Sequence, residues 1–431
     1  MSSSLVDYIP QILDFIFFAL TIGLPIVFWN LFFEAWVDMR RQIFWNKQTP
    51  VLLEIVLPKE VLKTPSSMEV FLLNINQTGG EGTWYDRNFL GKTRPQFSLE
   101  MVSIEGTVHF YIWTWKQWKK FIETQIYAQY PGIEVTEVKD YTKNWNFDPE
   151  RNGLWGCEFS LGKADPFPIK TYRDYGIGDD KLTEEDVKVD PITPIVELLG
   201  SVDQKQQMWI QIICRGKKED DPIPFSDRWK KFKDKLVSDN FNEAWKELWK
   251  GHEAWKTEAQ KQIEEIKKKA TPMIKGPDGK ESPGFPNYVK SQIEQIEALG
   301  RSVSKPGFEV GIRCLYLAEN EFFDGMNGPA LLSVFKQFGS SNLNGFKPKN
   351  VTSIDYPWQD FFGTGIIKKR TDLITAYKAR GYFFEPYKEK PMILNTEELA
   401  TIFHFPGKVV GTPTFERIGS KKSEPPANLP I

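Results

Sequence analysis

The feature that most constrains this chain is an uncharged apolar run near its amino terminus. Residues Phe15–Phe33 read FIFFALTIGLPIVFWNLFF, and no charged residue lies between Asp14 and Glu34. About 20 apolar residues are enough to cross a bilayer, and a membrane helix tolerates one interior proline. Because acidic rather than basic residues precede the run, it is not typical of a cleaved secretory signal. The sequence therefore predicts an external tail at 1–14 and a transmembrane helix at 15–36.

Basic residues set the expected orientation of this helix. Arg40, Arg41 and Lys47 follow the apolar run, and no lysine or arginine precedes it. Loops on the cytoplasmic side of a membrane are enriched in such residues. We therefore expect a single-pass protein of the inner (cytoplasmic) membrane, with its amino terminus outside, its carboxyl-terminal body in the cytoplasm and the lipid bilayer as a partner.

A regular order of strands and helices follows Pro50. The segments VLLEIVL and SSMEVFLLNI have the patterns of a buried strand and a helix. Two alternating runs around Glu105-Gly106 predict a hairpin, because glycine favours a tight turn between strands. Lys116–Tyr130 has helical spacing, and one more strand follows it. This strand–helix–strand–strand–helix–strand order predicts a ferredoxin-like (βαββαβ) domain at 48–142.

A weaker copy of the same order predicts a second ferredoxin-like domain at 153–356. Within it, apolar residues recur at three- and four-residue steps over 217–305, which predicts a helical-hairpin insertion resembling a short coiled coil. This hairpin is either a solvated structural arm or a contact for a partner. A helix and a proline-rich docking tail are expected at 357–431, and Asn395 and Glu398 have the spacing of a capping box at the start of this helix. The predicted fold class is thus α+β, with tandem ferredoxin-like domains after one transmembrane helix.

The sequence contains no pattern typical of a catalytic, cofactor or metal site. Gly91-Lys92-Thr93 resembles the end of a phosphate-binding loop, but Asp86 stands where that motif needs glycine. The three histidines lack metal-ligand spacing, and the three cysteines are far apart in apolar segments, which suits buried reduced thiols. We therefore expect no enzymatic activity, no cofactor and no metal.

One predicted strand carries aromatic residues on a single face. In Thr107–Trp115, the alternate positions Tyr111, Trp113 and Trp115 share a side of the sheet. Open sheets with this element order can stack nucleic-acid bases on such rings. The alternative function is therefore a membrane-tethered module for single-stranded nucleic acid, while the simpler interpretation is packing inside the protein.

Several segments together resemble a known group of proteins. Phe110–Val135, QMWIQIICR, FEVGIRCLYLAE and above all Thr396–Ile431 are similar to the membrane-anchored amino-terminal region of bacterial proteins related to type IV secretion and conjugation ATPases. In longer relatives the equivalent of PPANLP leads into a P-loop ATPase domain, whereas this sequence ends at Ile431. The resemblance implies a non-enzymatic component that anchors or docks a separate cytoplasmic P-loop ATPase.

The end of the sequence supplies the candidate contacts for that ATPase. Phe405, Pro406 and Gly407 follow the last predicted helix, and Pro425 and Pro426 lie in the polar tail. Proline-rich segments are extended and can lie along a partner. Homo-oligomer formation and nucleic-acid binding stay open as further interactions.

Overall fold

One antiparallel sheet of nine strands forms the frame of the protein. Eight strands follow the order β10-β5-β9-β6-β2-β3-β1-β4, and β13 pairs with β9 outside this path. The computed structural model describes residues 9–58, 63–177, 190–218, 255–271, 273–275, 281–353, 358, 360 and 363–407. The strands of the sheet are β1 (Pro50–Val56), β2 (Gln96–Ile104), β3 (Thr107–Trp115), β4 (Glu134–Val138), β5 (Asn152–Leu161), β6 (Gln206–Gly216), β9 (Gly307–Glu319), β10 (Phe346–Lys349) and β13 (Met392–Asn395).

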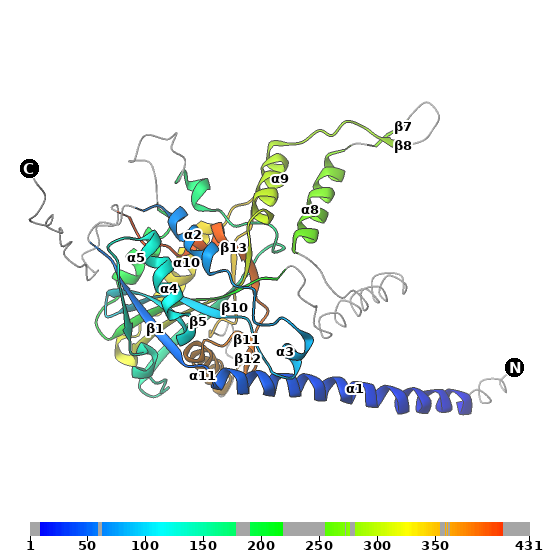
Figure 1. The fold of residues 1–431 in the computed structure, drawn as a ribbon, viewed down its shortest axis with the longest axis horizontal. Helices are drawn as coiled ribbons and strands as arrows, with labels where there is room; N and C mark the ends of the chain where they lie inside the picture. The colour runs from blue at the N-terminus through cyan, green and yellow to red at the C-terminus, as the bar shows by residue number, and fades with distance from the viewer. Residues whose placement is uncertain are drawn as a thin grey trace, which may run out of the picture.

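Helices cover both faces of this sheet (Figure 1). Successive residues of each strand face opposite sides of the sheet. In β1, for example, Leu53 packs against the helices of one face, and the preceding residue, Leu52, packs against those of the other face. This division follows from the two-residue period of a strand. The helices of the first face are α2 (Pro65–Ile75), α4 (Lys116–Gln129), α5 (Thr193–Gly200), α10 (Asn327–Phe335) and α12 (Thr396–Ile402). The second face is covered by α11 (Thr364–Ala379) and by the end of α1 (Ile9–Asn46).

The same series of elements occurs twice in the sheet. β1, α2, β2, β3, α4 and β4 form one half, and β5, α5, β6, β9, α10 and β10 form the other. The two halves occupy the sheet in mirrored order and meet where β2 pairs with β6, from Gln96–Arg215 to Ile104–Gln207. The hairpin predicted around Glu105-Gly106 is confirmed, with φ values of 52° and 84° at these two residues.

The membrane prediction is corrected by the structure. Among the described residues, no helix combines the length and apolar character that a membrane span needs. This finding overturns the transmembrane helix at 15–36 and the single-pass inner-membrane location derived from it. The end of α1 is instead used for packing on the body, since the Trp45 ring lies 5.4 Å from that of Trp115 and 6.5 Å from that of Trp113.

The predicted fold class of tandem ferredoxin-like domains after a membrane helix is also wrong. The strands assigned to both domains join in one sheet, and one apolar cluster extends from Leu53 in the first half to Phe338 in the second. The alternating pattern of a strand specifies its two faces but not its neighbour. The pairing of β2 with β6, which merges the halves, was therefore invisible in the sequence.

The helical hairpin predicted within 217–305 is an arm of two helices that projects from the body (Figure 1). Its helices pack through a narrow seam that buries Ala259, Ile266, Ala298 and Leu299. Residues 219–254 of the predicted insertion lie outside the described residues. The arm consists of α8 (Trp255–Ala270), α9 (Lys290–Val303) and the short strands β7 (Met273–Lys275) and β8 (Glu281–Pro283).

The remaining elements are short. β11 and β12 form a small separate hairpin, and α3 lies beside α1 (Figure 1). Their bounds are α3 (Trp84–Asn88), β11 (Phe383–Phe384), β12 (Tyr387–Lys388) and the 3₁₀ helices η2 (Tyr141–Asn144), η3 (Tyr172–Tyr175), η5 (Asn320–Phe322) and η6 (Lys336–Phe338).

Candidate functional site

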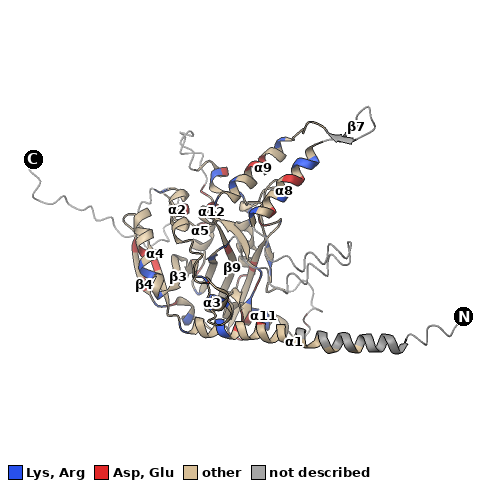
Figure 2. Ribbon diagram, turned by 45° about the vertical axis from the view of Figure 1, so that its right-hand side comes forward, with Lys and Arg blue, Asp and Glu red and all other residues tan. Residues whose placement is uncertain are grey.

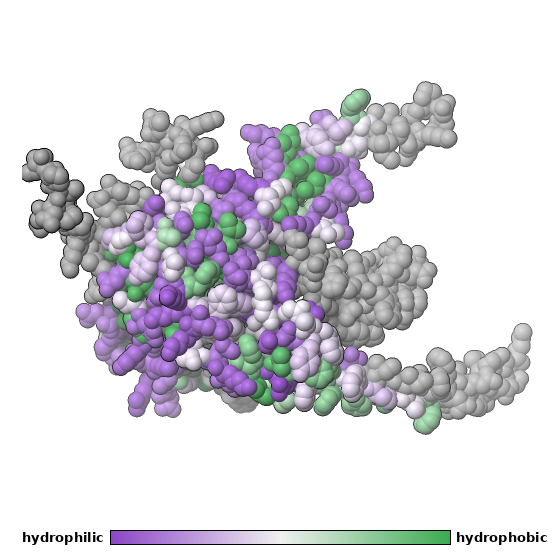
Figure 3. All heavy atoms as spheres, viewed as in Figure 1, coloured by the Kyte–Doolittle hydropathy of each residue, from purple (hydrophilic) through white to green (hydrophobic). Residues whose placement is uncertain are grey.

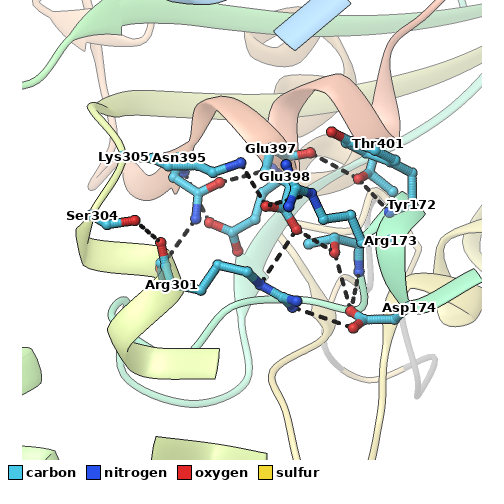
Figure 4. A network of polar contacts seen from close by, with 12 residues as sticks. Tyr172, Arg173, Asp174, Arg301, Ser304, Lys305, Asn395, Glu397, Glu398 and Thr401 are labelled. Carbon is cyan, nitrogen blue, oxygen red and sulfur yellow. Dashed lines mark hydrogen bonds and ion pairs between the residues drawn. The ribbon is translucent and has the colours of Figure 1, made fainter. Parts of the chain in front are cut away.

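A charged cluster joins the arm to the body (Figure 4). Glu397, at the start of α12, lies at its centre with only 2% of its side chain exposed. Lys305 follows α9 and donates to Glu397 Oε2 at 2.6 Å and to Glu69 of α2. Arg301 of α9 lies 3.2 Å from Asp174 of η3 and 3.6 Å from Glu397. We call these five residues the arm-base cluster, because they tie α9 to three elements of the body.

The two adjacent glutamates of α12 have different electrostatic environments. Burial alone would raise the pKa of Glu397, but hydrogen bonds from Lys305 and Thr171 hold that pKa below its ordinary value. Glu398 is fully buried and accepts hydrogen bonds from the backbone N–H groups of Asn395 and Ile169, both at 2.9 Å. Burial raises the pKa of Glu398 to about 8. The capping box of Asn395 and Glu398, predicted from the sequence, is confirmed.

The outer part of the arm carries an exposed apolar stripe. Phe285, Val289 and Ile293 have 94%, 63% and 44% of their surface exposed; Ile293 lies in α9, and the other two lie in the extended segment that leads into it. We call these three residues the arm stripe. Around them, acidic and basic residues alternate along the arm, while apolar residues gather on one side of it (Figures 2 and 3). Neighbouring exposed apolar residues on a projecting element are typical of a protein contact.

A row of polar residues crosses the opposite face of the sheet, beneath α11. Neighbouring strands place its members directly opposite one another, although they are far apart in the sequence. Arg313 and Glu158 are both fully buried and lie 2.9 Å apart, and Arg380, at the end of α11, lies 3.1 Å from Glu100. This polar row fixes the junction of the two halves and consists of Glu54, Tyr111, Glu100, Gln211, Arg313 and Glu158.

The aromatic residues predicted for nucleic-acid stacking lie inside the protein. Tyr111, Trp113 and Trp115 are only 5%, 6% and 2% exposed. The Tyr111 ring stacks on that of Tyr141 at 5.1 Å, and Trp45 covers both tryptophans. The structure therefore brings these residues together as a packed cluster rather than as an open platform for bases.

The predicted ATPase contacts are divided between the core and the undescribed tail. Phe405 is 1% exposed, and its ring lies 4.9 Å from Tyr130 and 5.6 Å from Phe110. Pro406 is also buried, and Gly407 is partly exposed. Pro425 and Pro426 lie outside the described residues. The segment before residue 408 is thus fixed to the body, so whatever follows leaves from a defined point.

The loop that resembles the end of a phosphate-binding motif has a structural role. Gly91 has a φ of 63°, and a Cβ atom there would lie 2.3 Å from the carbonyl carbon of Arg40. Glycine at this position lets the loop approach the backbone of α1. The loop is joined to α1 by a hydrogen bond from Arg40 Nε to the carbonyl oxygen of Phe89 at 2.5 Å.

The three cysteines are buried, and Cys157 lies directly opposite Cys314 across β5 and β9. Burial raises the pKa of the Cys214 and Cys314 thiols, which makes both poor nucleophiles. Within the described part of the chain, no group of His, Cys, Asp and Glu side chains is arranged to hold a metal ion.

Sequence reasoning missed the arm-base cluster entirely. The members of this cluster come from four separate segments of the chain and form no motif that the sequence marks; they are Glu69, Asp174, Arg301 with Lys305, and Glu397. The capping box at Asn395 was the one local signal near this cluster. It predicted the start of α12 but not the cations that gather around it.

Comparisons with known proteins place the chain in a family without assigning an activity. A search of curated proteins finds no match to it. The model of a family described as "Domain of unknown function (DUF8128)" matches residues 83–417, which include most of the sheet, the whole arm and α12. Since this match covers well over half of the sequence, the chain belongs to the DUF8128 family.

Proposed function

We propose that this chain is a non-enzymatic docking subunit that binds a separate P-loop ATPase of the type IV secretion class. The resemblance of Phe110–Val135 and Thr396–Ile431 to regions that accompany such ATPases supports the identity of the partner. The arm stripe on a projecting pair of helices is the observation that carries the docking role. The arm leaves the body and adds little to its core. Its exposed apolar residues are therefore interpreted as a surface that contacts another molecule.

The attachment of the arm agrees with a docking role. Lys305 holds the base of α9 through a shielded ion pair, because its side chain is 16% exposed and that of Glu397 is 2% exposed. Arg301, which is 35% exposed, adds a more accessible pair with Asp174. Shielded ion pairs hold their geometry better than exposed pairs, which solvent and salt weaken. A partner bound at the arm stripe would therefore be held at a defined position relative to the sheet.

The second docking element in this proposal is the tail after residue 407. Phe403 and Phe405 are buried against the first half of the sheet, and His404 Nε2 lies 2.7 Å from Asp190. These contacts keep the origin of the tail in place. The nucleic-acid alternative gains no support from the described residues, because the rings that would stack on bases are covered.

The test is recovery of the partner with the intact chain and with surface variants. The tagged full chain is purified from its native host, and the proteins that copurify are identified by mass spectrometry. A P-loop ATPase recovered in comparable molar amount supports the proposal, and its repeated absence with folded bait overturns it.

A pair of matched variants then tests the arm stripe. Val289→Asp/Ile293→Asp places two charges on the stripe, and aspartate is well tolerated at the helix start occupied by Val289. Val70→Asp/Leu73→Asp places the same charges on exposed positions of α2, which are 42% and 49% exposed. We expect ATPase recovery to fall about tenfold for the arm variant, equivalent to about 1.4 kcal/mol, and to be retained by the α2 variant. Equal loss in both variants would contradict docking through the arm.

A further inference from the structure

A cavity of about 470 Å³ lies where the arm meets the body. This volume is within the range of small-molecule sites in proteins, roughly 300–1,000 Å³. The body contributes residues from the loop after α2 and from the end of β6, and the arm contributes the first turn of α8 and the residues after α9. The residues that matter for its chemistry are Asn76, Lys217, Lys218, Trp255, Lys256 and Lys305.

The lining of this cavity is basic. Among the described residues that line it, four are lysines and none is acidic. Lys217 and Lys305 are partly neutralised by carboxylates behind the wall, since Lys217 Nζ lies 3.1 Å from Glu309 and Lys305 lies 2.6 Å from Glu397. Lys218 Nζ donates instead to the backbone carbonyl oxygen of Glu81 at 2.9 Å. This acceptor carries no net charge, so the bond does not neutralise the lysine.

A buried donor lies in the same wall. Trp255 is 7% exposed, and its indole Nε1 finds no hydrogen-bond partner among the described residues. A buried N–H group without an acceptor destabilises a folded protein, whereas an acceptor on a ligand would satisfy it. Lys256, the next residue, is exposed at the same end of α8. A negatively charged acceptor at this position would therefore meet both a cation and a neutral donor.

We propose that this cavity binds a phosphate-bearing anion, with Lys218 from the body and Lys256 from the arm as its principal cations. Lysine binds phosphate as a compact point charge, and charge-assisted hydrogen bonds are the stronger kind. Because the two lysines lie on opposite sides of the junction, the ligand connects the arm to the sheet. The site goes beyond the proposed docking function and does not require an ATPase to be present.

The experiment is calorimetric titration of the full chain with pyrophosphate, ATP and inorganic phosphate at low salt. Lys218→Gln/Lys256→Gln removes the two cations without adding bulk. Lys116→Gln/Lys120→Gln removes two exposed cations of α4 that do not line the cavity, and is the matched control. We expect pyrophosphate to bind, the cavity variant to lose at least about tenfold in affinity through two lost charge-assisted bonds, and the control to change less than about twofold.

The three probes separate the possible sources of the phosphate. Equal affinity for pyrophosphate and ATP supports recognition of the phosphates alone, and tighter binding of ATP supports a nucleotide whose base adds contacts. Trp255→Phe keeps an aromatic ring but removes the N–H donor, so it should weaken binding without abolishing it. Absence of binding by all three probes, or equal loss in the cavity and control variants, would overturn the proposal.

Hydrogen exchange supplies a readout that does not depend on affinity. Pyrophosphate at saturation should slow amide exchange at the first turn of α8 and at 304–307, because it would connect these segments to the body. Exchange that slows in the Lys218→Gln/Lys256→Gln variant as much as in the unchanged chain would also refute the assignment.

Discussion

Replacing Arg313 by methionine tests the polar row most directly. Arg313 is fully buried, and its guanidinium donates to Glu158 at 2.9 and 3.1 Å, to Gln211 at 3.2 Å and to the carbonyl oxygen of Gly381 at 3.0 Å. Methionine fills a similar volume but leaves the fully buried Glu158 without its cation. Breaking a buried ion pair in this way costs about 3–5 kcal/mol, a large part of the roughly 5–15 kcal/mol that stabilises a typical domain.

The assay is thermal unfolding of three variants side by side. Arg313→Met should lower the midpoint by several degrees, at roughly 2–4 °C per kcal/mol for a sizeable protein. Lys205→Met removes one partner of an exposed pair with Glu319, 49% and 52% exposed, and should cost less than about 1 kcal/mol. Glu158→Gln/Arg313→Met leaves no lone charge and should recover part of the loss. An Arg313→Met midpoint equal to that of Lys205→Met, or a double variant less stable than the single one, would refute the reasoning.

Three further predictions concern pH, packing and the tail. Burial opposes ionisation of Glu309, but Arg215, Arg94 and Lys217 lower its pKa from 4.5 to about 2. The ionised carboxylate should therefore add about 3 kcal/mol to the free energy of unfolding above pH 4.5, and this contribution should be lost as pH falls toward 2. In urea unfolding, Glu309→Gln should be less stable than the unchanged chain at pH 6 and nearly equal to it at pH 2. Gly311→Ala should cost about 1–3 kcal/mol in the same assay, because its Cβ would lie 2.4 Å from the Tyr382 ring; no loss would contradict that packing. Deleting residues 419–431 should weaken ATPase recovery without changing the unfolding midpoint, and unchanged recovery would remove the tail from the docking proposal.

Local patterns in the sequence predicted local structure well. The hairpin at Glu105-Gly106, the capping box at Asn395 and the helices of the arm all occur where spacing and turn chemistry place them. These features depend on residues within a few positions of one another. An alternating strand or a capped helix start can therefore be recognised without knowing its surroundings.

Features that depend on distant partners could not be predicted. The alternation of Tyr111, Trp113 and Trp115 indicated a shared face, but their cover comes from Trp45 and Tyr141. The members of the arm-base cluster and of the polar row also come from distant segments, so no spacing in the sequence marks them. Pairing between strands that are distant in the sequence joins the two halves into one sheet. The same pairing brings the buried charged residues together.

The junction of β2 with β6 gives the sheet an internal symmetry. The mirrored order of the two halves means that each presents the same kind of edge at the centre, in antiparallel register. An antiparallel contact between equivalent edges is what two identical subunits related by a twofold axis would make. The two halves are therefore arranged like the subunits of a twofold-symmetric homodimer, although they belong to one chain. Among the described residues, the arm breaks this symmetry, because it is inserted only between β6 and β9 of the second half.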